Sequence, residues 1–225
     1  MKRILPLENI DPRSVINMFA MNVANDKITD SGDGDAGVVV TVLSGNFGDN
    51  PVEYKIDSFL GFAGGPNMGY NGFPEVQLKI KKAASTDAAL GITMYETANK
   101  DENDEKYIRY PDKRASANVV TSGQAVPVFT KGLATFTYRA FGTGTSKSYV
   151  PPVNSILIQS ATDGLMTGIT EAQYRTSVTG TSPVYLPKLG RVIATGTAQS
   201  LNGQSEYYSE GTGQYYTATC LIDIN

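Results

Sequence analysis

The chain has 225 residues and a formal net charge of −3, and it contains no His, no Trp and one Cys. Histidine is the side chain that most readily moves protons near neutral pH and the commonest metal ligand. Its absence therefore excludes Ser and Cys triads built on imidazole and most zinc and iron sites. The negative balance offers no bulk attraction to nucleic acid or to an anionic membrane, and no run approaches the roughly 18 apolar residues of a membrane span. We therefore expect a soluble protein made in the cytoplasm, with no enzymatic activity, no cofactor and no metal ion.

The first 35 residues differ from the rest of the chain. Asp11 and Pro12 form a helix-start pair, with Asp as the cap and Pro at the first helical position. Apolar residues recur at near-helical spacing at Val15, Met18, Phe19 and Val23, but the same segment also alternates as a strand. A polar, acidic stretch follows at residues 25–37. We predict an extended or partly helical arm and linker over residues 1–35, which docks onto a neighbouring chain or packs on its own domain.

The remaining residues, 36–225, are predicted to form a single β domain. Short segments rich in Val, Ile, Thr and Tyr alternate with Gly, Pro, Asn and Asp, as is typical of an antiparallel sandwich or barrel. The expected strands cover residues 38–43, 76–80, 91–95, 107–110, 126–130, 133–138, 155–160, 165–169, 191–195 and 215–224. Gly132 and Gly164 are expected to supply the positive φ of tight hairpin turns. The predicted fold class is all-β, an antiparallel β-barrel or sandwich with an N-terminal arm and long Gly-rich loops.

The longest of these loops is expected at residues 61–74, which hold five glycines and two prolines and cannot form a regular element. Phosphate cradling would need a Gly-Lys-Ser/Thr ending and a following helix, and the segment has neither. We expect a surface loop that is ordered by aromatic residues, among them Phe62, Tyr70 and Phe73.

Two acidic stretches could be interpreted chemically. Asp30, Asp33 and Asp35 are closely spaced oxygen donors, but they lack the spacing and the terminal Glu of an EF-hand loop, which favours a solvated linker. Residues 101–106 contain four carboxylates, and a pair of carboxylates can act as acid and base in a glycosidase. Here they are close together in the sequence and need not converge across a cleft. A hydrated hairpin tip between two strands is favoured there.

The C-terminal region contains the tyrosines and the single cysteine. Two tyrosine pairs flank the segment SEGTGQ and indicate a hairpin in which Tyr207 and Tyr208 meet Tyr215 and Tyr216. Such a group could also bind a glycan or a protein, because tyrosine combines flat contact area with a hydroxyl. Cys220 lies in an apolar run and has no partner for an internal disulfide, so we expect a small buried core residue.

Five segments occur in the order LGITMYET, GQAVPVFTKGLATF, NSILIQSATDGLMTG, LGRVIATGTA and CLIDI. This order resembles the layout of small tailed-phage head decoration proteins, also called cement proteins. In that family a Leu-Gly-Ile/Val strand precedes a Val-Pro-Val and Lys-Gly strand pair, a Gly-Leu-x-Thr-Gly hairpin, a Leu-Gly-x-Val/Ile strand and a closing apolar strand. The resemblance covers residues 90–224 and leaves residues 1–89 outside.

The resemblance implies a virion structural protein that sits on the outside of an assembled head and clamps neighbouring major capsid subunits, often as a homotrimer. The alternatives are another virion component, such as a tail, neck or fibre-base protein, and a carbohydrate-binding adhesin module that uses the tyrosine hairpin. The candidate partner-binding residues are Val15, Met18, Phe19, Phe62, Tyr70, Phe73, Tyr208 and Tyr215. If the arm binds the capsid, removing residues 1–24 should leave a folded domain that no longer cosediments with heads.

Overall fold

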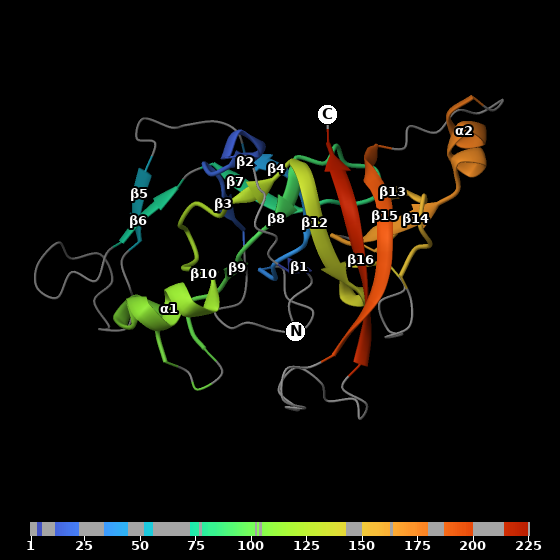
Figure 1. Cartoon of the computed structure of the whole chain (residues 1–225). Helices are drawn as coiled ribbons and strands as arrows, with labels where there is room; N and C mark the ends of the chain where they lie inside the picture. The colour runs from blue at the N-terminus through green and yellow to red at the C-terminus, as the bar shows by residue number, and fades with distance from the viewer. Residues whose placement is uncertain are drawn as a thin grey trace, which may run out of the picture.

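The computed structural model describes residues 4–5, 12–22, 34–44, 52–55, 73–76, 78–101, 103, 105–142, 150–162, 164–179, 187–199 and 214–224. Their strands form two six-stranded sheets and two small two-stranded sheets (Figure 1). The predicted all-β class is confirmed. Neither six-stranded sheet is closed into a barrel by its described strands, so the arrangement is closer to the sandwich than to the barrel.

The first six-stranded sheet, sheet A, is antiparallel throughout. Its strands lie in the order β1 (Ile4–Leu5), β12 (Lys131–Thr137), β16 (Gln214–Asp223), β15 (Lys188–Gln199), β13 (Ile156–Gln159) and β14 (Met166–Ile169). β13 and β14 form a hairpin, as residues 155–169 predict, and Gly164 has the expected positive φ of 76°. β15 and β16 extend together beyond the rest of the sheet (Figure 1).

The second six-stranded sheet, sheet B, has the order β2 (Val15–Ile16), β11 (Val128–Phe129), β8 (Gly91–Thr93), β4 (Val39–Ser44), β7 (Lys79–Lys82) and β3 (Ala20–Met21). Its edge strands β2 and β3 are separated in the chain by residues 17–19 alone, which span about 10 Å at most. A single bridge joins Ala20 to Ala125, just before β11. The sheet is therefore strongly curled, with its two edges close together.

The two small sheets pair β5 (Val52–Lys55) with β6 (Phe73–Val76), and β9 (Glu96–Thr97) with β10 (Val119–Val120). The described 3-10 turns cover Pro12–Ser14, Tyr107–Arg109 and Tyr138–Ala140. The strand predicted at residues 107–110 is therefore wrong. Tyr107 is buried in a small cluster with Ala98 and Val119, and the chain turns there to enter a helix that starts with Pro111.

Two short α-helices in the described part of the chain were not predicted. Helix α1 (Pro111–Ala117) starts with a proline and ends at Asn118, which adopts the left-handed conformation with φ 53°. Helix α2 (Glu171–Thr179) starts with a capping box. In this box Gln173 N donates to Thr170 Oγ1 at 3.2 Å, and Thr170 N donates to Gln173 Oε1 at 2.9 Å.

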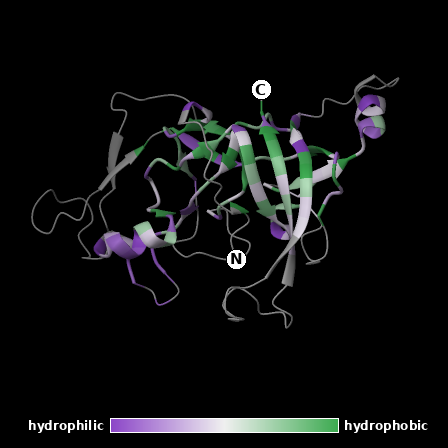
Figure 2. Ribbon diagram, viewed as in Figure 1, coloured by the Kyte–Doolittle hydropathy of each residue, from purple (hydrophilic) through white to green (hydrophobic). Residues whose placement is uncertain are grey.

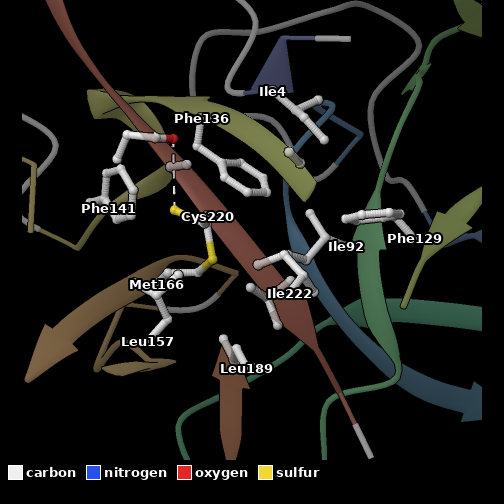
Figure 3. Close-up of a cluster of buried hydrophobic side chains, with 14 of the residues drawn as sticks. Ile4, Ile92, Phe129, Phe136, Phe141, Leu157, Met166, Leu189, Cys220 and Ile222 are labelled. Carbon is white, nitrogen blue, oxygen red and sulfur yellow. Dashed lines mark hydrogen bonds between the residues drawn. The ribbon is translucent and has the colours of Figure 1, made fainter. Parts of the chain in front are cut away.

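The main hydrophobic core lies between the two six-stranded sheets (Figure 3). Sheet A contributes Phe136, Leu157 and Ile222, and sheet B contributes Ile92 and Phe129; all five are buried. Both sheets therefore pack their inner faces on the same core. Along each strand, the residues that alternate with the core residues point to the outward face.

A second core fills the inside of the curled sheet B. It contains Phe19, Met21, Val38, Val40, Leu78, Ile80, Val126 and Val128. Alternation explains the division, since Val38 and Val40 point into this cluster while Val39 points into the main core. Burial on both faces explains why the run Val38 to Val40 is apolar without interruption.

The described residues of the predicted arm pair with strands of their own chain. β1 joins β12 in sheet A, whereas β2 and β3 join β11 and β7 in sheet B. Ile4, Phe19 and Met21 are buried there. Of the two alternatives predicted for the arm, packing on its own domain therefore describes residues 4–5 and 12–22, as strands and a 3-10 turn.

The end of the predicted linker is also part of the packed structure. Ala36 is buried in the main core, and Thr97 N donates to Gly34 O at 2.7 Å. The solvated linker is thus wrong for residues 34–37, while Asp30 and Asp33 lie outside the described residues. The domain boundary at residue 35 stays a prediction.

Candidate interaction surface

The outward face of sheet A presents large apolar side chains to solvent. Ala134, Cys220 and Val192 point into the main core from β12, β16 and β15, so the adjacent positions on these strands point to the opposite face. These adjacent positions include Leu133, Leu221 and Ile193, whose side chains are 38%, 47% and 47% exposed, respectively. We call these three residues the outer patch.

Leu133 and Leu221 of the outer patch are direct cross-strand neighbours, and Ile193 lies two residues along β15 from the partner of Leu221. Leu133 lies directly opposite Leu221, and Leu221 lies opposite Arg191 on β15. Ile193 occupies a β-bulge, where the register of β15 against β16 shifts. Residues directly opposite each other in such a ladder have Cβ atoms about 4.5–5.5 Å apart. Figure 2 shows the hydrophobic colour on β16 and β15, with hydrophilic colour at the nearby strand ends.

Polar groups border the outer patch on two sides. Lys131 Nζ lies 3.2 Å from Asp223 Oδ1, next to Leu133 and Leu221. The two groups form an ion pair whose geometry is not that of a hydrogen bond. Beyond the patch in the other direction along β12 and β16, the hydroxyl oxygens of Thr135 and Thr219 lie 3.0 Å apart. An apolar centre with a polar rim is therefore built into the sheet.

The third side of the rim connects the sheet to α2. Arg191 Nη2 lies 3.0 Å from Glu171 Oε2, and Arg175 Nε lies 3.1 Å from Glu171 Oε1. Glu171 therefore links two arginines, one on β15 and one in the first turns of α2. Figure 1 shows α2 standing apart from the sheets, so these ion pairs and its capping box anchor its start.

The backbone beneath the outer patch is held closely. A Cβ atom on Gly190 would lie 2.2 Å from the carbonyl oxygen of Leu221, so β15 and β16 approach to a distance that only glycine permits. Cys220, next to Leu221, is fully buried (Figure 3). This burial confirms the predicted small core residue. It also raises the pKa of the Cys220 thiol to about 12, which argues against a nucleophile.

The predicted partner-binding residues of the arm lie elsewhere and in different environments. Val15 is half-buried in β2, opposite Phe129. Phe19 is buried in the second core, whereas Met18 is 47% exposed in the connection between β2 and β3. Phe19 is therefore not accessible to a partner in this structure, and Met18 is.

The other predicted partner-binding residues fall on the loop and the tyrosine hairpin. Phe73 lies in β6 opposite Lys55, and Tyr215 lies in β16 opposite Ala198. Phe62, Tyr70 and Tyr208 lie outside the described residues, as does most of the glycine-rich loop. The structure therefore does not bring the eight predicted residues together within its described part.

The predicted tyrosine hairpin lies partly outside the described residues. Tyr215 and Tyr216 pair with Ala198 and Thr197 of β15. Tyr207 and Tyr208 are not among the described residues, so their pairing with Tyr215 and Tyr216 stays a prediction. Tyr216 is 42% exposed on the part of β16 that extends beyond the core.

The acidic run at residues 101–106 is a turn with a buried carboxylate at its base. An isolated antiparallel bridge joins Lys100 to Lys106, so the chain reverses there as predicted, but the second of the two predicted strands is the 3-10 turn Tyr107–Arg109. Asp101, however, is buried, where hydration was expected. It accepts hydrogen bonds from Asn103 N at 2.9 Å and Glu105 N at 2.8 Å, and from Lys113 Nζ.

These contacts determine the charge state of the Asp101 and Lys113 pair. The hydrogen bond from Lys113 lowers the pKa of Asp101, and the two backbone N–H groups lower it further. The hydrogen bonds to Asp101 and Glu105 raise the pKa of Lys113. The Asp101 carboxylate therefore stabilises the turn in which it lies.

No group of three or more Cys, Asp or Glu side chains that could hold a metal ion occurs among the residues that the structure describes. Neither of the two helices described has the length and apolar character of a bilayer span.

The sequence interpretation missed the outer patch because it assigned the apolar residues of these strands to the core. A signal was available in β16, where Cys220 and Ile222 alternate with Leu221, so both faces of the strand carry apolar residues. A strand of that kind is either covered on both faces or exposed on one. Only the tertiary structure distinguishes these cases.

Comparisons with known proteins were made on the whole chain. No protein-family model, no curated protein and no solved structure matches it.

Proposed function

We propose that this chain is a structural protein of a tailed-phage virion that binds the outside of the assembled head, the role implied by the resemblance of residues 90–224 to head decoration proteins. The observation that carries the proposal is the outer patch. Single exposed apolar residues are ordinary on protein surfaces, whereas neighbouring ones with a polar rim can form the centre of a surface that associates with another protein. Leu133, Ile193 and Leu221 also lie in three of the five segments that carry the resemblance.

The packing of sheet A supports a binding role for this surface. The patch lies on strands that are paired on both sides and rest on a buried core. Such a surface is formed before the partner arrives, so little conformational entropy is lost on binding. Three side chains provide only the centre of an interface, since a stable one buries about 800 Å² on each partner. A regular shell would compensate, because many equivalent contacts act together.

In this proposal the sheet replaces the N-terminal arm as the main contact. Phe19 and Met21 already fill the second core of their own chain. Using them to bind a neighbour would expose that core, at a cost of about 1.5–3 kcal/mol for each large side chain. Clamping of neighbouring major capsid subunits, and assembly as a homotrimer, remain parts of the proposal.

A reconstruction of virions that contain this protein tests the proposal. We expect its density on the outer surface of the head, in copy numbers set by the icosahedral symmetry, with sheet A facing the major capsid protein. Density in the tail, neck or fibre base would replace the head assignment by another virion role. Absence of the protein from purified virions would contradict both.

A further inference from the structure

We infer that helix α2 is only partly formed in the free chain, and that a protein partner that covers the outer patch stabilises the helix. The inference rests on the proposed function and adds a conformational response to binding at the same surface. The packing of α2, its composition and its ion pair with the rim of the patch carry this inference.

Helix α2 lacks the packing that normally stabilises a helix in a protein. Figure 1 shows it standing apart from the sheets. None of its residues 171–177 is buried, although Tyr174 and Ser177 are half-buried. The helix has nine residues, and an isolated helix of fewer than about 12–15 residues is marginally stable in water. An element with so few buried side chains opens at a much lower free energy than the core of the same protein.

The second half of α2 also consists of residues that favour a helix only weakly. Residues 176–179 are Thr, Ser, Val and Thr, and β-branched residues have a low helix propensity. The hydroxyl groups of Thr176 and Ser177 donate to the carbonyl oxygens four residues earlier, each at 2.9 Å. Hydrogen bonds of this kind slightly weaken a helix and often bend it. The first turn is better held, because it contains the capping box.

The start of α2 is joined to the outer patch through Arg191. Arg191 on β15 lies directly opposite Leu221 on β16, so the two side chains are neighbours on the outward face. The ion pair of Arg191 with Glu171 has both side chains 46% exposed. An exposed pair contributes little to stability, because water and salt screen it and because two long side chains lose rotamer freedom.

A partner that covers Leu221 strengthens this ion pair. The covering surface restricts the rotamers of the neighbouring Arg191, so less entropy is lost when Arg191 binds Glu171. The same surface excludes water from one side of the pair, where the attraction is then screened less. The helix that begins at Glu171 gains the difference. A small gain is sufficient, because the formed and unformed states of a marginal helix are close in free energy.

The first part of the inference is tested on the free chain by hydrogen exchange, measured by mass spectrometry from milliseconds to hours. Amides of residues 174–179 should be at least about a hundredfold less protected than those of β13, whose four residues are buried. Glu171→Gln and Arg191→Gln should each speed the exchange of α2 about two- to fivefold. The control is Lys81→Gln, which removes a pair with Asp87 in which the lysine is also 46% exposed. This control should leave the exchange of α2 unchanged.

The second part is tested on the chain bound to heads that are purified from the encoding phage and lack this protein. Exchange of residues 174–179 should slow about three- to tenfold on binding, as the ion pair becomes less screened. In Arg191→Gln, at head concentrations that bind the variant fully, most of this slowing should be lost.

The outcomes separate the inference from the proposed function. Protection of α2 in the free chain equal to that of β13 overturns the inference. If the chain binds heads and the exchange of α2 is unchanged or faster, or slows equally in Arg191→Gln, the inference is overturned and the proposed function stands. If the unsubstituted chain does not bind heads, both are overturned.

Discussion

Asp101 is a carboxylate whose surroundings make it part of the fold rather than of a reactive site. Its oxygens accept hydrogen bonds from two backbone N–H groups of the 101–105 turn and from the ammonium group of Lys113 on α1. The run of acidic residues that contains Asp101 predicts a reversal of the chain, which the bridge between Lys100 and Lys106 confirms, but it does not predict the 3-10 turn that follows in place of a strand. The sequence could not show that the first of these carboxylates is buried, because its burial depends on Lys113, which the fold places beside it.

The lowered pKa of Asp101 predicts a pH dependence of stability. The ordinary pKa of an Asp carboxyl group is 3.8, and in Asp101 it is lowered. Such a group stabilises the folded chain at pH values above its ordinary pKa, and this contribution is lost as the pH falls through the pKa of the folded state. Asp101→Asn should therefore lower the urea midpoint at pH 7, and the difference from the unsubstituted chain should shrink under acid conditions. Asp112→Asn, exposed on α1, is the control. A difference that stays constant down to the acid limit would contradict the assignment.

Gly190 predicts a steric effect on the strand pair below the outer patch. A methyl group there would lie 2.2 Å from Leu221 O and 3.0 Å from Ile222 Cα, both of them backbone atoms that cannot move independently. We expect Gly190→Ala to destabilise the fold by about 1–3 kcal/mol in urea unfolding, as overpacking does. In the same strand, Gly196→Ala meets only Thr217 Oγ1 at 3.7 Å and should change stability by less than about 0.5 kcal/mol. Equal effects of the two substitutions would argue against the close approach of β15 to β16.

At the scale of elements, the three N-terminal strands join both sheets. β1 adds Ile4 to the main core, while β2 and β3 form the two edges of sheet B. The sequence left helix and strand open here because Val15, Phe19 and their neighbours fit both periods. Pairing with β11 and β7 decides the matter, and both of these partners are distant in sequence.

Removal of residues 1–21 should therefore unfold the protein. The truncated chain lacks β1, β2 and β3, including the buried Ile4, Phe19 and Met21. At about 1.5–3 kcal/mol for each large buried side chain, the loss is comparable with the total stability of a typical domain. Thermal unfolding followed by near-UV circular dichroism measures this, with a chain lacking only residues 1–3 as the control. A cooperative transition at an unchanged temperature would show that the arm is dispensable for folding.

The short helices illustrate which elements local sequence can reveal. Pro111 at the start of α1, and the Thr170 to Gln173 capping box of α2, are recognisable start signals. Both helices, with 7 and 9 residues, are shorter than the roughly twelve residues over which a helical period can be recognised. The strands of sheet A were largely predictable, since Ile, Leu and Thr are frequent in residues 155–169 and 215–224.

At the scale of the whole molecule, two sheets share one core, and one of them leaves apolar side chains on its outward face. Alternation in the sequence predicts which residues of a strand share a face, but not which face is covered. Irregular pairing adds a further obstacle on β15. Leu189, Arg191 and Ile193 would share a face in a regular strand, yet Leu189 is in the main core and Ile193 is exposed, because the pairing of β15 shifts against both of its neighbours. The candidate surface was therefore beyond the reach of the sequence.

The central claim is that the outward face of β12, β16 and β15 is the surface that a partner covers. Hydroxyl-radical footprinting of the free chain and of the head-bound chain tests this most directly, because oxidation of aliphatic side chains follows their exposure to solvent. Leu133, Ile193 and Leu221 should become protected on binding, while Leu43 and Val153, which are 48% and 46% exposed elsewhere, should be oxidised as before. Unchanged oxidation of the outer patch in the bound chain, with protection at other positions, would contradict the claim.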